Sequence, residues 1–173
     1  MSRRRVASLG AAFALACGAC SLILDFDKPP DAGPADAPVD DTACMAYEPN
    51  DAPADAEVIS PGTYEAAICG GGETDYFRFS VDGAQAVTAR IEFMNRNGAG
   101  DIDLRLLSVD GATTIAESRT SNDFEMVMCP GGVLCTAPLP AGDYLLQVLG
   151  FNAAVQASYT LTLTVTAARP AAD

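Results

Sequence analysis

The sequence predicts an all-β domain, a sandwich or barrel of about eight short strands. Between Cys44 and Thr166, apolar residues recur at every second position, a pattern that buries one face of a pleated strand and leaves the other in water. Turn-forming residues separate these runs at short intervals. Glycine, threonine, valine and proline are frequent, which favours strands and turns over helices.

The alternation gives each predicted strand one apolar face. A first strand is expected over residues 64–69. The apolar residues expected to share a face in the later strands are Phe77, Phe79 and Val81; Val87, Ala89, Ile91 and Phe93; Ile102, Leu104 and Leu106; Phe124, Met126 and Met128; Tyr144, Leu146 and Val148; and Tyr159, Leu161, Leu163 and Val165. Turns are expected at residues 60–62, 70–72, 82–83, 97–98, 110–111, 130–132 and 141–143.

The N-terminus predicts an export signal over residues 1–19. Arg3, Arg4 and Arg5 precede an apolar stretch over residues 6–16, and small residues follow. A basic start, an apolar run of about 7–15 residues and a small-residue cleavage site define a secretory signal. The run is shorter than the roughly 20 residues that a membrane-spanning helix needs. The adjacent arginines leave both the general and the twin-arginine export routes open.

A cysteine at the end of this signal predicts a lipid anchor. Small residues precede both Cys20 and Cys17. We favour Cys20 as the lipidated residue, with Cys17 as the alternative, because cleavage before Cys20 leaves an even number of cysteines for an oxidising compartment. Secretion without a lipid is the other alternative. The even set consists of Cys44, Cys69, Cys129 and Cys135.

Four cysteines allow three pairings, and we prefer Cys44–Cys69 with Cys129–Cys135. The segment between Cys129 and Cys135 contains Pro-Gly-Gly, which can turn the chain back on itself. Cys44 precedes the first strand and could join that entry to the end of the strand at 64–69. A zinc site would need paired Cys-x-x-Cys motifs or histidine. The four cysteines of the domain have no such spacing, and the sequence has no histidine.

The rest of the chain divides into a linker, one domain and a tail. Residues 20–43 form a predicted disordered linker. Its segment 27–42 is dominated by proline, alanine and aspartate and in an extended form could hold the domain about 50 Å from its anchor. Residues 44–166 form the domain, and residues 167–173 a C-terminal tail. All 23 acidic residues but only 7 of the 10 basic ones follow Cys20, so the mature chain carries a charge near −16. Such a charge argues against nucleic acid as a partner.

The sequence contains no known catalytic pattern. It lacks histidine, a Gly-x-Ser-x-Gly elbow and a phosphate-binding loop, so we expect no enzyme activity. Asp101 and Asp103 lie two residues apart on a predicted strand and therefore face the same side. We interpret them as a turn residue and a solvated strand residue, because an acid–base pair also needs a substrate cleft.

An ordered set of motifs resembles the bacterial pre-peptidase C-terminal domain family. The motifs are Tyr47-Glu48-Pro49-Asn50-Asp51, Gly62, Asp75-Tyr76-Phe77, Gly100-Asp101-Ile102-Asp103-Leu104, Ala141-Gly142-Asp143-Tyr144 and Tyr159-Thr160-Leu161. The resemblance implies a jelly-roll-like antiparallel β-sandwich. Family members are appended to secreted peptidases or stand alone as exported proteins. No peptidase precedes the domain in this sequence, so the resemblance leaves binding or adhesion as the implied activity.

The resemblance also implies calcium as the one candidate cofactor. Calcium-binding relatives hold the ion near the Glu-Pro-Asn-Asp segment and the acidic loop before Asp-Tyr-Phe. The matching positions are Glu48, Asn50, Asp51, Glu73 and Asp75. The sequence departs from those relatives at Ala46, where they carry another acidic residue.

These features together predict a lipid-anchored, non-catalytic binding or adhesion module at a bacterial cell envelope. We expect it at the outer membrane, with soluble secretion as the alternative. Its partners would be the membrane, through the lipid, and a protein or polysaccharide that the sequence does not specify. A structural envelope protein without a specific ligand and a calcium-responsive accessory domain are the alternative functions.

Overall fold

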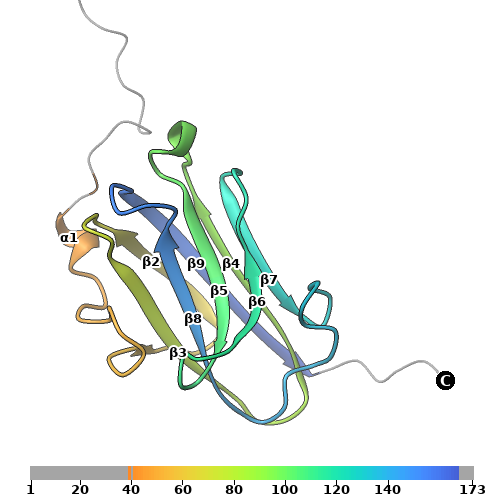
Figure 1. Cartoon of the computed structure of the whole chain (residues 1–173). Coiled ribbons are helices and arrows are strands. Elements are labelled where there is room, and N and C mark those ends of the chain that lie inside the picture. The colour runs from red at the N-terminus through yellow and green to blue at the C-terminus, as the bar shows by residue number, and fades with distance from the viewer. Residues whose placement is uncertain (1–38, 40, 168–173) are drawn as a thin grey trace, which may run out of the picture. The chain divides into compact units, whose positions relative to one another are not determined.

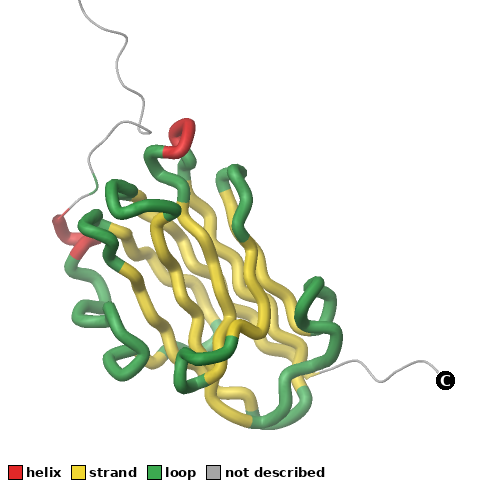
Figure 2. Tube along the Cα trace, viewed as in Figure 1, coloured by secondary structure: helices red, strands yellow, loops and turns green. Residues whose placement is uncertain are grey.

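The computed structural model describes residue 39 and residues 41–167, which form a sandwich of two β-sheets (Figures 1 and 2). The all-β prediction is confirmed. The predicted signal over 1–19, almost all of the linker over 20–43 and nearly all of the tail over 167–173 lie outside the described residues. Among the described residues, no helix is long and apolar enough to span a bilayer.

Strands account for nearly all of the regular structure. The elements in chain order are α1 (Asp41–Cys44), β1 (Glu57–Val58), β2 (Gly62–Ile68), β3 (Thr74–Val81), β4 (Gln85–Phe93), the 3₁₀ turn η2 (Arg96–Gly98), β5 (Ile102–Ser108), β6 (Thr114–Ser118), β7 (Phe124–Cys129), β8 (Gly142–Gly150) and β9 (Ala157–Ala167). The sequence pattern missed β1 and β6. Both are short, and their sequences lack the strict alternation that marks the other strands.

The two sheets are built almost entirely from antiparallel pairs. One sheet has the strand order β1-β3-β8-β5-β6 and the other has the order β2-β9-β4-β7. Only the short β1 pairs in parallel, against β3. The links β2–β3, β4–β5, β6–β7 and β8–β9 therefore all lie at one end of the sandwich, which we call the loop end (Figure 2).

The core lies between the sheets and includes most of the residues that the alternation predicted. The apolar residues that were predicted to share one face of β3, β4, β5, β8 and β9 are nearly all buried in this core. On β9 the threonines at positions 160, 162, 164 and 166 alternate with them on the outer face. Alternation predicts these faces because successive side chains of a strand point to opposite sides.

The prediction for β7 is wrong, because the opposite face of this strand is buried. Phe124 and Met126 are exposed, whereas Glu125, Val127 and Cys129 point inward. The register with β4 explains the reversal. Glu125, Val127 and Cys129 pair with Ile91, Ala89 and Val87, which are core residues, and directly paired residues share a face. Arg90 covers the outward Phe124, with its guanidinium carbon 4.5 Å from the ring centroid.

Two disulfides join Cys44 to Cys69 and Cys129 to Cys135, the pairings that the sequence favoured. The first joins α1 to the residue that follows β2, so the entry to the domain is held against the loop end. The second closes the loop that follows β7.

Candidate functional site

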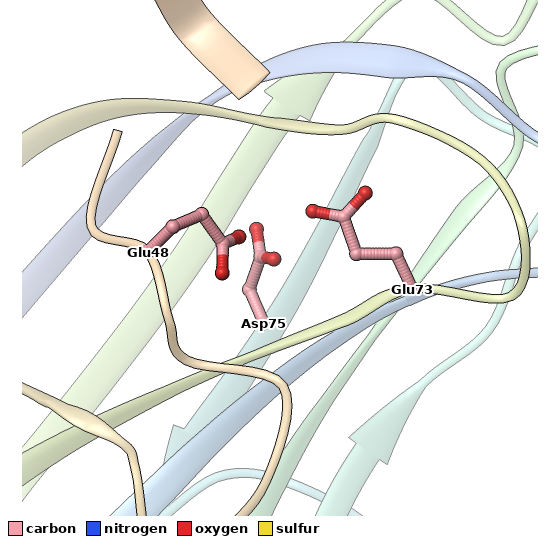
Figure 3. A group of neighbouring side chains, drawn as sticks. All are labelled: Glu48, Glu73 and Asp75. Atoms are coloured by element: carbon pink, nitrogen blue, oxygen red, sulfur yellow. The ribbon is translucent and has the colours of Figure 1, made fainter. Parts of the chain in front are cut away.

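Three carboxylates converge at the loop end, and we call Glu48, Glu73 and Asp75 the acid cluster. One carboxylate oxygen from each lies within 4.8 Å of the others. Figure 3 shows the three side chains pointing toward a common centre. Glu48 comes from the segment before β1, Glu73 from the link between β2 and β3, and Asp75 from β3 itself.

A glycine turn places Glu73. Gly70, Gly71 and Gly72 all have positive φ angles, of 97°, 71° and 84°. Glycine adopts this conformation without the strain that a side chain would add. The turn brings the Glu73 carboxylate back to the backbone N–H of Cys69, which donates to it at 2.6 Å.

The disulfide and an aromatic contact place Glu48. Cys44 is bonded to Cys69, with 5.7 Å between their Cα atoms. The ring of Tyr47 packs edge-on against Tyr64, at a centroid distance of 6.0 Å, and against Phe77, at 5.9 Å. These contacts hold the segment that carries Glu48 against the sheets.

Asn50 lies next to the acid cluster and is fully buried. Its backbone N–H donates to Glu48 Oε2 at 3.1 Å, and its carbonyl oxygen accepts from the N–H of Tyr76 at 2.9 Å. Its side-chain Oδ1 and Nδ2, by contrast, have no hydrogen-bond partner, and neither does Oδ1 of Asp75, which is only 2% exposed. An unpaired buried polar atom costs about 1–3 kcal/mol, so this part of the site has unused capacity to bind a ligand.

The buried carboxyl of Asp75 resists ionisation. Burial raises its pKa from 3.8 to about 7, and the charges of Glu73, Glu48 and Asp51 act in the same direction. A hydrogen bond from the phenol of Tyr159 opposes the shift. Burial also raises the pKa of Glu73, against the lowering effect of the Cys69 N–H bond. Oxygen atoms gathered in this way suit a hard divalent cation, which would offset their mutual repulsion.

Only three of the five residues expected to bind calcium converge in the structure. Glu48, Glu73 and Asp75 converge, and Asn50 lies beside them. Asp51 lines a neighbouring depression of about 510 Å³ with residues 70–74. Asp51 therefore borders the acid cluster without belonging to it.

Two further acidic residues are buried near the loop end. Asp103 is 2% exposed and accepts from Nε of Arg119 at 3.0 Å, so the expectation of a solvated strand residue is wrong. Glu125 accepts from the backbone N–H and Oγ1 of Thr120, each at 2.7 Å, and from the hydroxyl of Ser118. No sequence pattern indicated Glu125, because its partners lie outside its own strand.

Comparison with known proteins identifies the fold. No protein-family model matches this sequence, and no curated protein matches it either. Among solved structures, the pre-peptidase C-terminal domain of a collagenase from Bacillus anthracis is similar with a TM-score of 0.50 at 19% identity, over 63% of this chain and 94% of that domain. PliG, a periplasmic inhibitor of g-type lysozyme from Aeromonas hydrophila, has a TM-score of 0.47 at 14% identity, over 64% of this chain and 96% of that protein. At such identity the first likeness shows the fold alone: the sandwich is similar to a pre-peptidase C-terminal domain.

Proposed function

We propose that this chain is an exported, lipid-anchored and non-catalytic binding module, and that a calcium ion at the acid cluster holds its entry segment against the β-sandwich. The β-sandwich fold and the similarity to the pre-peptidase C-terminal domain of a collagenase support a binding role. Two disulfides support an oxidising compartment, because structural disulfides are rare where thiols are kept reduced.

The observation that carries the calcium assignment is the unpaired Oδ1 of Asp75. Oδ1 of Asp75 is buried without a partner, and one oxygen of the same carboxylate lies within 4.8 Å of carboxylate oxygens of Glu48 and Glu73. Without a cation there, Asp75 would have to hold a proton to relieve the repulsion among the three acids, at a pH where an ordinary aspartate is ionised. Calcium takes six to eight oxygen ligands, and Glu48, Glu73, Asp75 and Oδ1 of Asn50 would supply protein ligands.

The position of the ion suggests its role. The segment that carries Glu48 and Asn50 leads from the N-terminal part of the chain to β1. It is also attached by the Cys44–Cys69 disulfide, by the packing of Tyr47 and by the hydrogen bond from the N–H of Tyr76 to the carbonyl of Asn50. A cation shared by Glu48, Glu73 and Asp75 would join this segment to β3. Calcium would then hold the segment of Glu48 and Asn50 in one position against the sandwich, and the stability of the domain would depend on the calcium concentration.

Calorimetry of the full chain, in calcium and in chelator, tests the calcium part of the proposal. Calcium at about 100 times its Kd adds about 2.7 kcal/mol, so we expect the Tm to rise by roughly 5–15 °C. The D75N variant should lose most of this rise, because an amide is a weaker ligand than a carboxylate. D82N is the control: Asp82 is an exposed acid in the turn between β3 and β4, at the opposite end of the sandwich. A wild-type Tm that is the same in calcium and in chelator would overturn the proposal.

Mass spectrometry of the protein from its native host tests the anchor. We expect a mature chain that begins at Cys20 and carries acyl chains. A lipidated chain that begins at Cys17 would support the anchor at the alternative residue. An unmodified chain that begins beyond Cys20 would exclude the anchor and leave soluble secretion.

A further inference from the structure

A groove at the loop end is separate from the acid cluster. It consists of two adjoining depressions of about 630 and 520 Å³, which share Asp101 and Ser121. The walls come from three links: β4–β5, β6–β7 and β8–β9. We call this feature the loop-end groove. Clefts of a few hundred cubic ångströms are typical of small-ligand sites.

The lining of the loop-end groove combines polar groups of both charges with one aromatic ring. Asp101 and Asp123 supply carboxylates, and Arg119 supplies a guanidinium whose side chain is 47% exposed. Phe151 borders the same groove with 63% of its surface exposed. Here an exposed phenylalanine lies beside hydrogen-bonding groups at the rim of a cleft. This combination is typical of surfaces that bind a ligand with both polar and apolar faces.

The charges exclude other classes of small ligand. Asp101, Asp103 and Asp123 lie in or beside the groove and would repel an anion such as a phosphate. Arg96 and Arg119 also line it and would oppose a free metal cation. A purely apolar ligand would displace water from these charged groups without offering them hydrogen bonds in exchange. A neutral ligand rich in hydroxyl groups satisfies all of them, because each hydroxyl both donates and accepts.

Hydrogen bonds already hold the walls of the groove in place. Asn95 is buried, and its backbone N–H donates to Asp123 Oδ1 while its Nδ2 donates to Asp101 Oδ1, both at 2.9 Å. The N–H of Phe151 donates to the carbonyl of Asp101 at 2.9 Å. Each carboxylate has about four lone-pair directions, so one internal bond leaves acceptor capacity for a ligand. Groups fixed before binding lose less entropy when a ligand arrives.

We propose that the loop-end groove binds a neutral polysaccharide, with Phe151 stacked on a sugar ring and Asp101, Asp123 and Arg119 hydrogen-bonded to its hydroxyl groups. The apolar C–H face of a pyranose ring suits an aromatic surface, and pairs of adjacent hydroxyls suit a carboxylate or a guanidinium. This inference rests on the proposed binding function and specifies its ligand class.

Affinity electrophoresis in native gels tests the proposal. The probes are dextran, laminarin and xyloglucan as neutral polymers and chondroitin sulfate as an anionic one. The full chain carries a formal net charge of −13, so it migrates well and its retardation by a polymer is easily measured. We expect retardation by at least one neutral polymer and none by chondroitin sulfate.

Matched variants locate the site. F151A should raise the apparent Kd about tenfold, since loss of about 1.4 kcal/mol of stacking corresponds to that factor. D123N should weaken binding by a similar factor while its side-chain carbonyl still accepts from the N–H of Asn95. The controls are L134A, which truncates a 60% exposed apolar residue in the β7–β8 link at the opposite end, and D82N. Both controls should bind as the wild type does.

Three outcomes would overturn the proposal: no retardation by any neutral polymer, retardation by chondroitin sulfate alone, or binding that F151A and D123N leave unchanged. The calcium-dependent Tm of the same proteins separates this proposal from the preceding one. If the wild type keeps its calcium-dependent rise in Tm but binds no neutral polymer, only the assignment of the groove fails. If the rise in Tm is missing, the proposed calcium role fails.

Discussion

Asp75 on β3 accepts a hydrogen bond from the phenol of Tyr159 on β9, and this bond joins the two sheets inside the sandwich. Both residues are 2% exposed. The bond pairs Oδ2 of Asp75 with a donor and leaves the buried Oδ1 without one, while the carboxylate as a whole belongs to the acid cluster. The same carboxyl therefore contributes to the core on one side and to the candidate calcium site on the other.

The buried carboxyl of Asp75 predicts a pH dependence of stability in calcium-free buffer. Its pKa is about 7 in the folded protein and near 3.8 when unfolded. Between these values the folded state binds the proton more strongly, so the free energy of unfolding should fall as pH rises from about 4 to about 7. The total effect is on the order of a few kcal/mol, at about 1.4 kcal/mol per pKa unit.

Urea unfolding in chelator across this pH range measures the effect in the wild type and in D75N. The amide of D75N does not titrate, so in this variant the free energy of unfolding should fall less between about pH 4 and about pH 7 than in the wild type. D82N should keep the wild-type slope. Equal slopes for the wild type and D75N would contradict a raised pKa for Asp75.

Removing the phenol hydroxyl of Tyr159 should destabilise the fold. Y159F leaves one oxygen of Asp75 without its donor, which costs about 1–3 kcal/mol for a buried group. It also removes the bond that lowers the pKa of Asp75. In calcium-free buffer, the free energy of unfolding should therefore keep falling to a higher pH than in the wild type. Y64F is the matched control, because the hydroxyl of Tyr64 bonds at an exposed position to the backbone of Ser60. Urea unfolding should show a larger loss for Y159F than for Y64F, and a loss of the same size in both would argue against the buried pair.

Replacing the Cys44–Cys69 disulfide should affect both stability and calcium binding. The bridge closes a loop with a sequence separation of 25, and C44A/C69A should cost about 3 kcal/mol in the chain-entropy model. The calcium-dependent rise in Tm should shrink as well, since the bridge holds the segment that carries Glu48. C129A/C135A removes the bridge with a separation of 6 and should leave the calcium response intact. Calorimetry in calcium and in chelator compares the two, and an undiminished response in C44A/C69A would contradict the linkage.

A methyl group at Gly100 should distort one wall of the loop-end groove. An added Cβ would lie 2.2 Å from the carbonyl oxygen of Met94, and the N–H of Gly100 bonds to the carbonyl of Asn95 at 2.8 Å. Because the obstacle is backbone, G100A should cost about 1–3 kcal/mol, the usual range for overpacking. At Gly83 an added Cβ has open space, so G83A should be neutral or slightly stabilising. Urea unfolding of both variants checks this, and G100A as stable as G83A would contradict the packing at this wall.

The strands and most of the core faces could be predicted from the sequence because their signal is local. In β3 the residues Phe77, Phe79 and Val81 alternate with polar neighbours, and a period of two has one structural solution, a strand with one buried face. The disulfide pairing could also be inferred, from parity and from the turn between Cys129 and Cys135. The members of the acid cluster could be named only through a family resemblance.

What the sequence by itself determined is therefore the fold class, the inward faces of the alternating strands, the absence of histidine-based chemistry and the strong negative charge. Only the tertiary structure decided which face of β7 is buried, because both alternating sets contain apolar residues and the register with β4 selects one. It also decided that Glu125 and Asp103 are buried, since the fold of β6 and the link after it brings Ser118 and Thr120 to Glu125 and Arg119 to Asp103. The acid cluster and the loop-end groove have the same origin. Each is assembled from segments that are distant in sequence and come together at one end of the sandwich. A local sequence pattern cannot predict such long-range contacts.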